Sequence, residues 1–185
     1  MPVFVVLLRG VNVGRANRIA MADLRAVLTA NGFAEVSTYI QSGNIILSAT
    51  KRDASAVARD VREVLARELA LDVPVVALTA RELLDVIEAN PYAGESDPKR
   101  LHAIVLPEPP DAGALHSVAA HAKAAAQGGS RDGVTVIGRI AYLHTPDGFS
   151  DSALANVLTA GRTKVLANGT ARNWATITAL ASMVH

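Results

Sequence analysis

Residues 9–14 form a polar segment whose backbone and side chains could hold an anion. Its polar or flexible members, and the basic residues that follow, are Arg9, Gly10, Asn12, Gly14, Arg15 and Arg18, and no acidic residue occurs before Asp23. Glycine tolerates positive φ and permits close backbone approach, so N–H groups could point at an anion beside the bidentate guanidinium of Arg9. An ordinary turn is the alternative, because the G-x-x-x-G spacing matches neither the dinucleotide fingerprint nor the phosphate-binding loop.

A second polar segment follows a short alternating run and consists of Gln41, Ser42, Gly43 and Asn44. Its amide and hydroxyl groups can both donate and accept hydrogen bonds. Turn residues of this kind also occur where no ligand binds, so a simple turn is again the alternative. We include the four residues in the candidate ligand site.

A third polar segment precedes the last apolar pattern of the chain. We expect a helix over residues 171–184 with Thr170 as its N-cap, which places Arg172 and Asn173 at a helix N-terminus. These two side chains are either solvated or part of the ligand site. The spacing of Trp174 to the apolar residues that follow predicts a core position for the tryptophan.

The three segments contain no histidine and no carboxylate, the groups that general acid–base catalysis normally uses. They therefore favour holding a ligand over transforming one, and we assign no catalytic residue. His116 and His121 are five residues apart, which is not the spacing of a helical metal pair, and the chain has no cysteine. We expect no metal and no cofactor.

The hydrophobic pattern of the first half predicts the element order βαββαβ followed by a helix. The apolar run 3–8 is typical of a strand buried on both faces. The remaining expected elements are a helix from Met21 that ends at Asn31-Gly32, strands over 36–40 and 44–48, a helix over 53–71, a strand over 74–78, and a helix over 79–89 with Thr79 as its N-cap.

The second half repeats this order without residue-level similarity. After a linker over 92–99 we expect a strand over 101–106, a helix over 113–126, hairpin strands over 134–137 and 140–144, a helix over 151–161, a short strand over 165–167, and the last helix. The strand over 165–167 is the least certain element of the second half. We predict domains over 1–92 and 100–185.

A βαββαβ unit in one antiparallel sheet has a consequence for the polar segments. Its first two strands run parallel, and the third runs antiparallel between them. The loop after the first strand and the turn at 41–44 then emerge at the same end of the sheet. We therefore expect these two segments to meet.

Composition limits the classes of partner. The chain has 185 residues, of which 50% are hydrophobic, and 18 basic residues against 17 acidic ones give a formal net charge of +1. No overall field attracts nucleic acid or membrane, no apolar run reaches the length of a membrane span, and the first apolar run is too short for a signal peptide. We expect a cytoplasmic protein with no membrane partner and an undetermined oligomeric state.

The three polar segments together resemble the signature stretches of DUF1697, a bacterial family of unknown function. The stretches are Leu7 to Gly14, Thr38 to Asn44 and Thr170 to Trp174, and the resemblance runs nearly end to end. It implies an α+β fold of two ferredoxin-like α/β-plait domains, with antiparallel sheets and helices on one face of each. It implies no established activity, substrate or catalytic residue.

The leading functional hypothesis is a binding module for a small anionic ligand that bears a phosphate or resembles a nucleotide. Whether the protein is an enzyme is left open, and an enzyme would need an acid or base from elsewhere, such as Asp23 or a histidine. RNA binding by a sheet face is a further alternative, although the stacking aromatics and positive charge that favour nucleic-acid binding are missing. A structural or oligomer-forming role is the last alternative.

Overall fold

The computed structural model describes residues 1–14, 17–51, 53–159, 165–166 and 168–184. The chain divides into two compact units, which are described separately below. Unit 1 contains Met1–Asp85 and the C-terminal residues from Ala179, and unit 2 contains Val86–Thr178. The domain ranges 1–92 and 100–185 stay a prediction about which parts of the chain fold independently.

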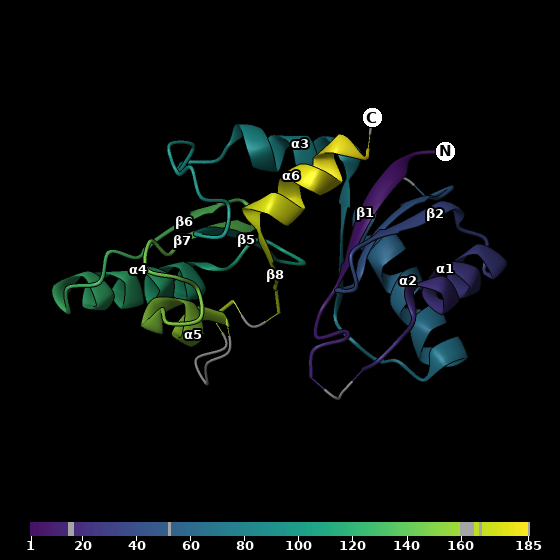
Figure 1. Ribbon diagram of the computed structural model, residues 1–185, viewed down its shortest axis with the longest axis horizontal. Helices are drawn as coiled ribbons and strands as arrows, with labels where there is room; N and C mark the ends of the chain where they lie inside the picture. The colour runs from purple at the N-terminus through teal and green to yellow at the C-terminus, as the bar shows by residue number, and fades with distance from the viewer. Residues whose placement is uncertain (15–16, 52, 160–164, 167, 185) are drawn as a thin grey trace. The chain divides into compact units, whose positions relative to one another are not determined.

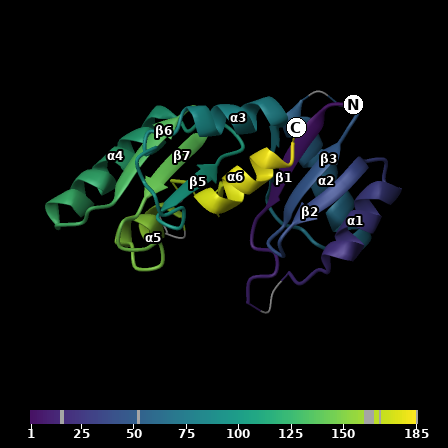
Figure 2. The same cartoon turned by 45° about the horizontal axis from the view of Figure 1, so that its top comes forward.

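Unit 1 is a four-stranded antiparallel sheet with two helices on one face (Figures 1 and 2). Its elements are β1 (Val3–Leu8), α1 (Met21–Ala30), β2 (Ala34–Tyr39), β3 (Asn44–Ser48), α2 (Ala54–Leu69) and β4 (Val75–Thr79). The strand order is β2-β3-β1-β4, with every neighbouring pair antiparallel. This arrangement confirms the ferredoxin-like prediction, including the position of the third strand between the first two.

The core of unit 1 follows from the alternation of side chains along β1. Phe4, Val6 and Leu8 pack with the apolar residues of α1 and α2, and each is fully buried. Val5 and Leu7 point to the opposite face of the sheet and are fully buried as well. Because the strand is buried on both faces, its sequence is a continuous apolar run.

Local hydrogen bonds fix the beginnings of two helices. The Asp53 carboxylate accepts hydrogen bonds from the backbone N–H groups of Ser55 and Ala56, which caps α2. Thr79 caps α3 (Ala80–Glu88), because its hydroxyl accepts from Glu82 N while the Glu82 carboxylate accepts from Thr79 N. This reciprocal pair is a capping box, and it confirms the predicted N-cap at Thr79.

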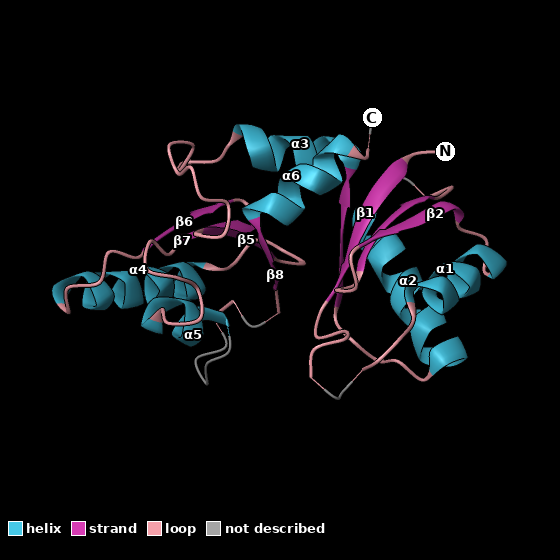
Figure 3. Cartoon of the chain, viewed as in Figure 1, coloured by secondary structure: helices cyan, strands magenta, loops and turns pink. Residues whose placement is uncertain are grey.

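Unit 2 has the same sheet topology as unit 1 (Figure 3). It contains β5 (Leu101–Val105), α4 (Ala112–Gln127), β6 (Gly133–Ile137), β7 (Ile140–His144), α5 (Ala153–Thr159) and β8 (Thr170–Asn173), and α6 (Trp174–Ser182) begins there. The order is β6-β7-β5-β8, again antiparallel throughout, with α4 and α5 on one face. The α+β class with two ferredoxin-like sheets is therefore confirmed.

The last strand and the last helix lie elsewhere than the sequence predicted. The strand is Thr170–Asn173, paired with β5, rather than residues 165–167, of which 167 lies outside the described residues. The helix begins at Trp174, and its cap is Asn173, whose side-chain oxygen accepts from Thr176 N at 2.9 Å, rather than Thr170. The side chains of this strand show no apolar alternation, so the sequence pattern did not predict it. Its pairing with β5 depends on backbone groups instead.

Candidate functional site

The two predicted polar segments of unit 1 meet at the end of β1. The backbone N–H of Leu8 donates to the carbonyl of Gly43 at 2.8 Å, and the Asn12 side-chain amide donates to the carbonyl of Gln41 at 2.8 Å. The convergence expected from the strand order is thereby confirmed. We call Arg9, Asn12, Gln41, Ser42 and Asn44 the β1-loop cluster.

Asn12 holds the loop in its conformation. Besides the bond to Gln41, its Nδ2 donates to the carbonyl of Ile19 at 2.9 Å, and its Oδ1 accepts from Ile19 N at 2.9 Å. Its backbone N–H donates to the carbonyl of Asn17 at 3.1 Å. Both amide donors of Asn12 are engaged, so this residue positions the loop and its share in ligand binding stays a prediction.

The loop backbone turns repeatedly through the left-handed region. Gly10 has φ 68°, Asn12 has φ 56° and Gly14 has φ 64°. Glycine and asparagine adopt such angles more readily than other residues. The expectation that the glycines of this segment serve positive φ is therefore met, and a role of Gly10 and Gly14 in ligand binding stays a prediction.

The turn between β2 and β3 is shaped by Asn44 and Gly43. Asn44 is fully buried, and its Nδ2 donates to the carbonyl of Tyr39 at 3.1 Å and to Ser42 Oγ at 3.0 Å. Gly43 has φ 73°, and a Cβ on it would lie 2.7 Å from Leu8 Cβ. The turn therefore needs glycine here, while the Gln41 side chain at its tip is exposed.

Two described arginines, Arg9 and Arg18, belong to the segment that follows β1. Arg9 follows β1 directly, is half-buried, and donates its backbone N–H to the carbonyl of Pro74 at 3.0 Å. The guanidinium of Arg18 lies 3.3 and 3.4 Å from the carbonyl oxygen of Gly14. Arg15, which we also assigned to the basic loop, lies outside the described residues.

Arg172 and Asn173 belong to β8 in unit 2. Arg172 Nη1 donates to Thr170 Oγ1 at 2.7 Å and to the carbonyl of Ala171 at 2.9 Å, and burial lowers the pKa of its guanidinium to about 10. Asn173 caps α6 as described above. Their participation in a ligand site stays a prediction.

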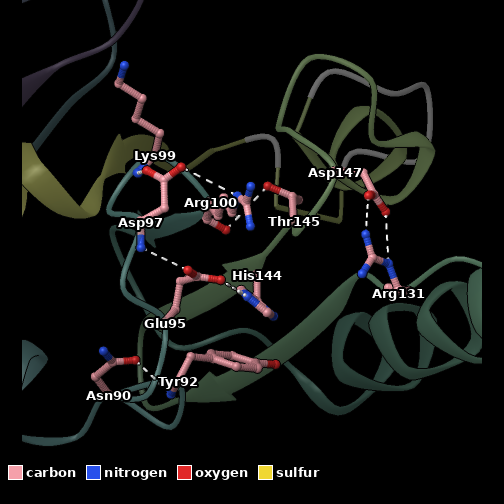
Figure 4. Close-up of polar contacts among 10 residues, drawn as sticks. All are labelled: Asn90, Tyr92, Glu95, Asp97, Lys99, Arg100, Arg131, His144, Thr145 and Asp147. Carbon is pink, nitrogen blue, oxygen red and sulfur yellow. Dashed lines mark hydrogen bonds and ion pairs between the residues drawn. The ribbon is translucent and has the colours of Figure 1, made fainter.

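Sequence reasoning missed a polar cluster in unit 2, which Figure 4 shows. The Glu95 carboxylate lies 2.7 Å from Nε2 of His144, and their side chains are 13% and 21% exposed, respectively. The Tyr92 ring stacks on the His144 ring, with centroids 5.1 Å apart and an angle of 27° between the planes. We call Tyr92, Glu95 and His144 the β7 cluster.

No local signal could have revealed the β7 cluster. Glu95 and His144 are 49 residues apart, and Glu95 lies in the segment predicted as a linker. That segment folds onto the sheet: the Tyr92 hydroxyl lies 3.1 Å from Thr135 Oγ1 on the edge strand β6. The hydrogen bond from His144, followed by one from the backbone N–H of Asp97, lowers the pKa of the Glu95 carboxyl.

His102 stands apart from both clusters. Its ring packs against Phe149 with centroids 4.1 Å apart, and burial lowers the pKa of its imidazole to about 4. Its Nδ1 is buried and has no hydrogen-bond partner among the described residues. Within the described part of the chain, no three histidine or acidic side chains gather closely enough to hold a metal ion.

The fold and these sites define an α+β protein with two ferredoxin-like units and a glycine-containing polar loop at the end of its first strand. The chain belongs to the family described as "Protein of unknown function (DUF1697)", which matches residues 1–142. It is also similar to the solved structure of the conserved bacterial protein SP0830 from Streptococcus pneumoniae. That alignment has a TM-score of 0.77 at 21% sequence identity and covers 100% of this chain and 99% of the other, so it supports the shared fold alone.

No curated protein matches the chain. Among the described residues, no helix has the length and apolar character that a membrane crossing requires.

Proposed function

We propose that the β1-loop cluster binds a small ligand that carries a phosphate group or resembles a nucleotide. The observation that carries the proposal is the hydrogen bond from Asn12 Nδ2 to the carbonyl of Gln41, which joins the basic loop to the amide-rich turn. Arg9 directly follows β1, whose residues 4–8 are buried, and the hydrogen bond from its backbone N–H to the carbonyl of Pro74 ties it to the chain before β4. A guanidinium on a rigid support is suited to bidentate recognition of phosphate.

The composition of the cluster supports binding rather than reaction. It contains an arginine, amides and a hydroxyl, but no imidazole and no carboxylate. Asp23, the acidic residue that follows in the sequence, is exposed in the first turn of α1. With one cation and several neutral hydrogen-bonding groups, we expect the cluster to bind a phosphate together with a polar ring or sugar. We place this activity in the cytoplasm.

A thermal-shift titration with inorganic phosphate, AMP and a hexose phosphate tests the proposal. A probe at about one hundred times its Kd stabilises the folded protein by about 2.7 kcal/mol, which raises the melting temperature by several degrees. We expect AMP or the sugar phosphate to produce this shift and Arg9→Ala to abolish it.

Arg59→Ala is the matched control, because Arg59 is an exposed arginine of α2 in the same unit. It should keep the full shift, since it changes the net charge of the protein as much as Arg9→Ala does. A shift that survives in Arg9→Ala, or that disappears equally in both variants, would contradict the proposed site. So would the absence of a shift with every probe.

A further inference from the structure

Unit 1 has an open pocket of about 310 Å³ at the end of its sheet opposite the β1-loop cluster. Helix α1 begins after the loop that follows β1 and ends at Ala30, and β3 begins at the turn 41–44 and ends at Ser48, so both elements lead away from that cluster. The residues after α1, the residues after β3 and one side of α2 line the pocket, which we call the α2 pocket. Its volume lies at the lower end of the range for small-molecule sites.

The floor of the α2 pocket is apolar. Its residues are Phe33, Ala49, Val57 and Val64, which belong to the core of unit 1 and are each no more than 9% exposed. Because core packing holds these side chains in place, the floor is formed before a ligand arrives. An apolar group that lies on it loses contact with water, which favours binding.

The rim of the α2 pocket carries balanced charges. Two basic side chains, Lys51 and Arg67, and two acidic ones, Asp60 and Glu63, line it. Lys51 Nζ lies 2.6 Å from Asp60 Oδ2, and Arg67 Nη2 donates to Asn31 Oδ1 at 2.6 Å. A rim whose charges cancel favours a ligand that itself carries both signs of charge over a simple anion or cation.

Glu63 and Arg67 have opposite charges but are not paired with each other. They are four positions apart on α2, which is one helical turn or roughly 6 Å along the axis. Arg67 uses Nε for Glu68 and Nη2 for Asn31, and its Nη1 bonds to none of the described residues. Glu63 is exposed and likewise forms no hydrogen bond or ion pair within the part of the chain that the structure describes. The rim therefore has an acceptor for a cation and a donor for an anion one turn apart.

We propose that the α2 pocket binds a free α-amino acid with an apolar side chain. The ammonium group of the ligand pairs with the Glu63 carboxylate, and its carboxylate accepts hydrogen bonds from Nη1 of Arg67. Val64, which follows Glu63 on α2, is part of the floor on which the apolar side chain of the ligand lies. This site is separate from the β1-loop cluster and does not depend on the function proposed for it.

Titration of the full-length protein with L-leucine, followed by amide NMR, tests the proposal. We expect a Kd of about 1 mM and shifts of the backbone amides of Gly32 and Thr50, which line the pocket. Leucinamide lacks the carboxylate, N-acetyl-L-leucine lacks the ammonium group, and glycine lacks the apolar side chain, so each should bind at least about fivefold more weakly. Equal affinity for any of these three probes would overturn the proposal. So would the absence of shifts at Gly32 and Thr50 with L-leucine at about ten times the expected Kd.

Glu63→Gln separates recognition of the ammonium group from a general effect on the fold. The substitution should weaken L-leucine about fivefold, because it removes one charge of an exposed ion pair, and should leave the weaker binding of N-acetyl-L-leucine unchanged. Asp23→Asn is the matched control, because it removes an exposed carboxylate from the first turn of α1, at the other end of that helix, and should keep the wild-type affinity. Equal affinities for L-leucine in wild type and Glu63→Gln would overturn the proposal. An equal loss for both probes in Glu63→Gln, or an equal loss in Asp23→Asn, would overturn it as well.

Discussion

Replacement of Asn12 by alanine should destabilise unit 1 far more than its position in a surface loop suggests. Asn12 makes three side-chain hydrogen bonds, two of them to the half-buried backbone of Ile19 and one to the exposed carbonyl of Gln41. Its backbone also lies in the left-handed region at φ 56°, where alanine is less favourable than asparagine. The substitution removes all three bonds and leaves the strained conformation in place.

The magnitude follows from these contacts. A half-buried hydrogen bond contributes about 1 kcal/mol and an exposed one about half as much. Alanine in the left-handed region costs about 1 kcal/mol more than asparagine. We therefore expect Asn12→Ala to lower the free energy of unfolding by about 3.5 kcal/mol.

Asn17→Ala provides a matched control in the same loop. Asn17 has φ 50°, and its exposed side chain makes one long hydrogen bond, 3.2 Å from Nδ2 to the carbonyl of Gly10. Its replacement carries the same backbone cost but loses only this bond, so we expect about 1.5 kcal/mol. The difference of about 2 kcal/mol between the variants measures how strongly Asn12 holds the loop.

Urea denaturation of the two variants checks this expectation. The midpoint of the unfolding transition should fall, while the dependence of the unfolding free energy on urea concentration stays unchanged. Equal destabilisation by both substitutions would refute the reasoning, because it would show that only the backbone conformation matters. A loss below about 0.5 kcal/mol for Asn12→Ala would show that the loop is not held by these hydrogen bonds at all.

Three further substitutions, two in unit 1 and one in unit 2, test local packing. Gly43→Ala should lower the free energy of unfolding, measured by urea denaturation, by about 2–4 kcal/mol, because it adds a contact of 2.7 Å with Leu8 Cβ to the strain of φ 73°. Gly10→Ala, at φ 68°, meets no atom within 4 Å and should lower it by only about 1 kcal/mol. Equal costs would contradict the contact with Leu8. Tyr142→Phe should cost about 1–3 kcal/mol, because the buried hydroxyl donates to the carbonyl of Val86 at 2.8 Å. Burial raises the pKa of Tyr142 from 10.0 to about 12, so its contribution to stability is complete below pH 10 and declines as the pH rises toward 12. A pH series of the unfolding free energy should show this decline in the wild type and less of it in Tyr142→Phe, and identical profiles would count against it.

The position of the β1-loop cluster could be predicted because it depends on strand order. The apolar run at 3–8 and the alternation before Gln41 indicate the strands, and an antiparallel arrangement of a βαββαβ unit places their following loops at one end. The hydrogen bond between Asn12 and Gln41 agrees with that expectation. The sequence did not show that both donors of Asn12 are used within the loop, because partner atoms are set only by the folded backbone.

The sequence by itself determined the element order, the buried first strand and the cap at Thr79, since periodicity and capping are local properties of the chain. Only the tertiary structure decided that Thr170–Asn173 is a strand. The backbone of this segment pairs with the edge of β5, and that pairing does not depend on the types of its side chains. The meeting of Glu95 with His144 was likewise decided there. The two residues are 49 positions apart in the chain, so their contact depends on the fold and cannot be predicted from a local sequence pattern.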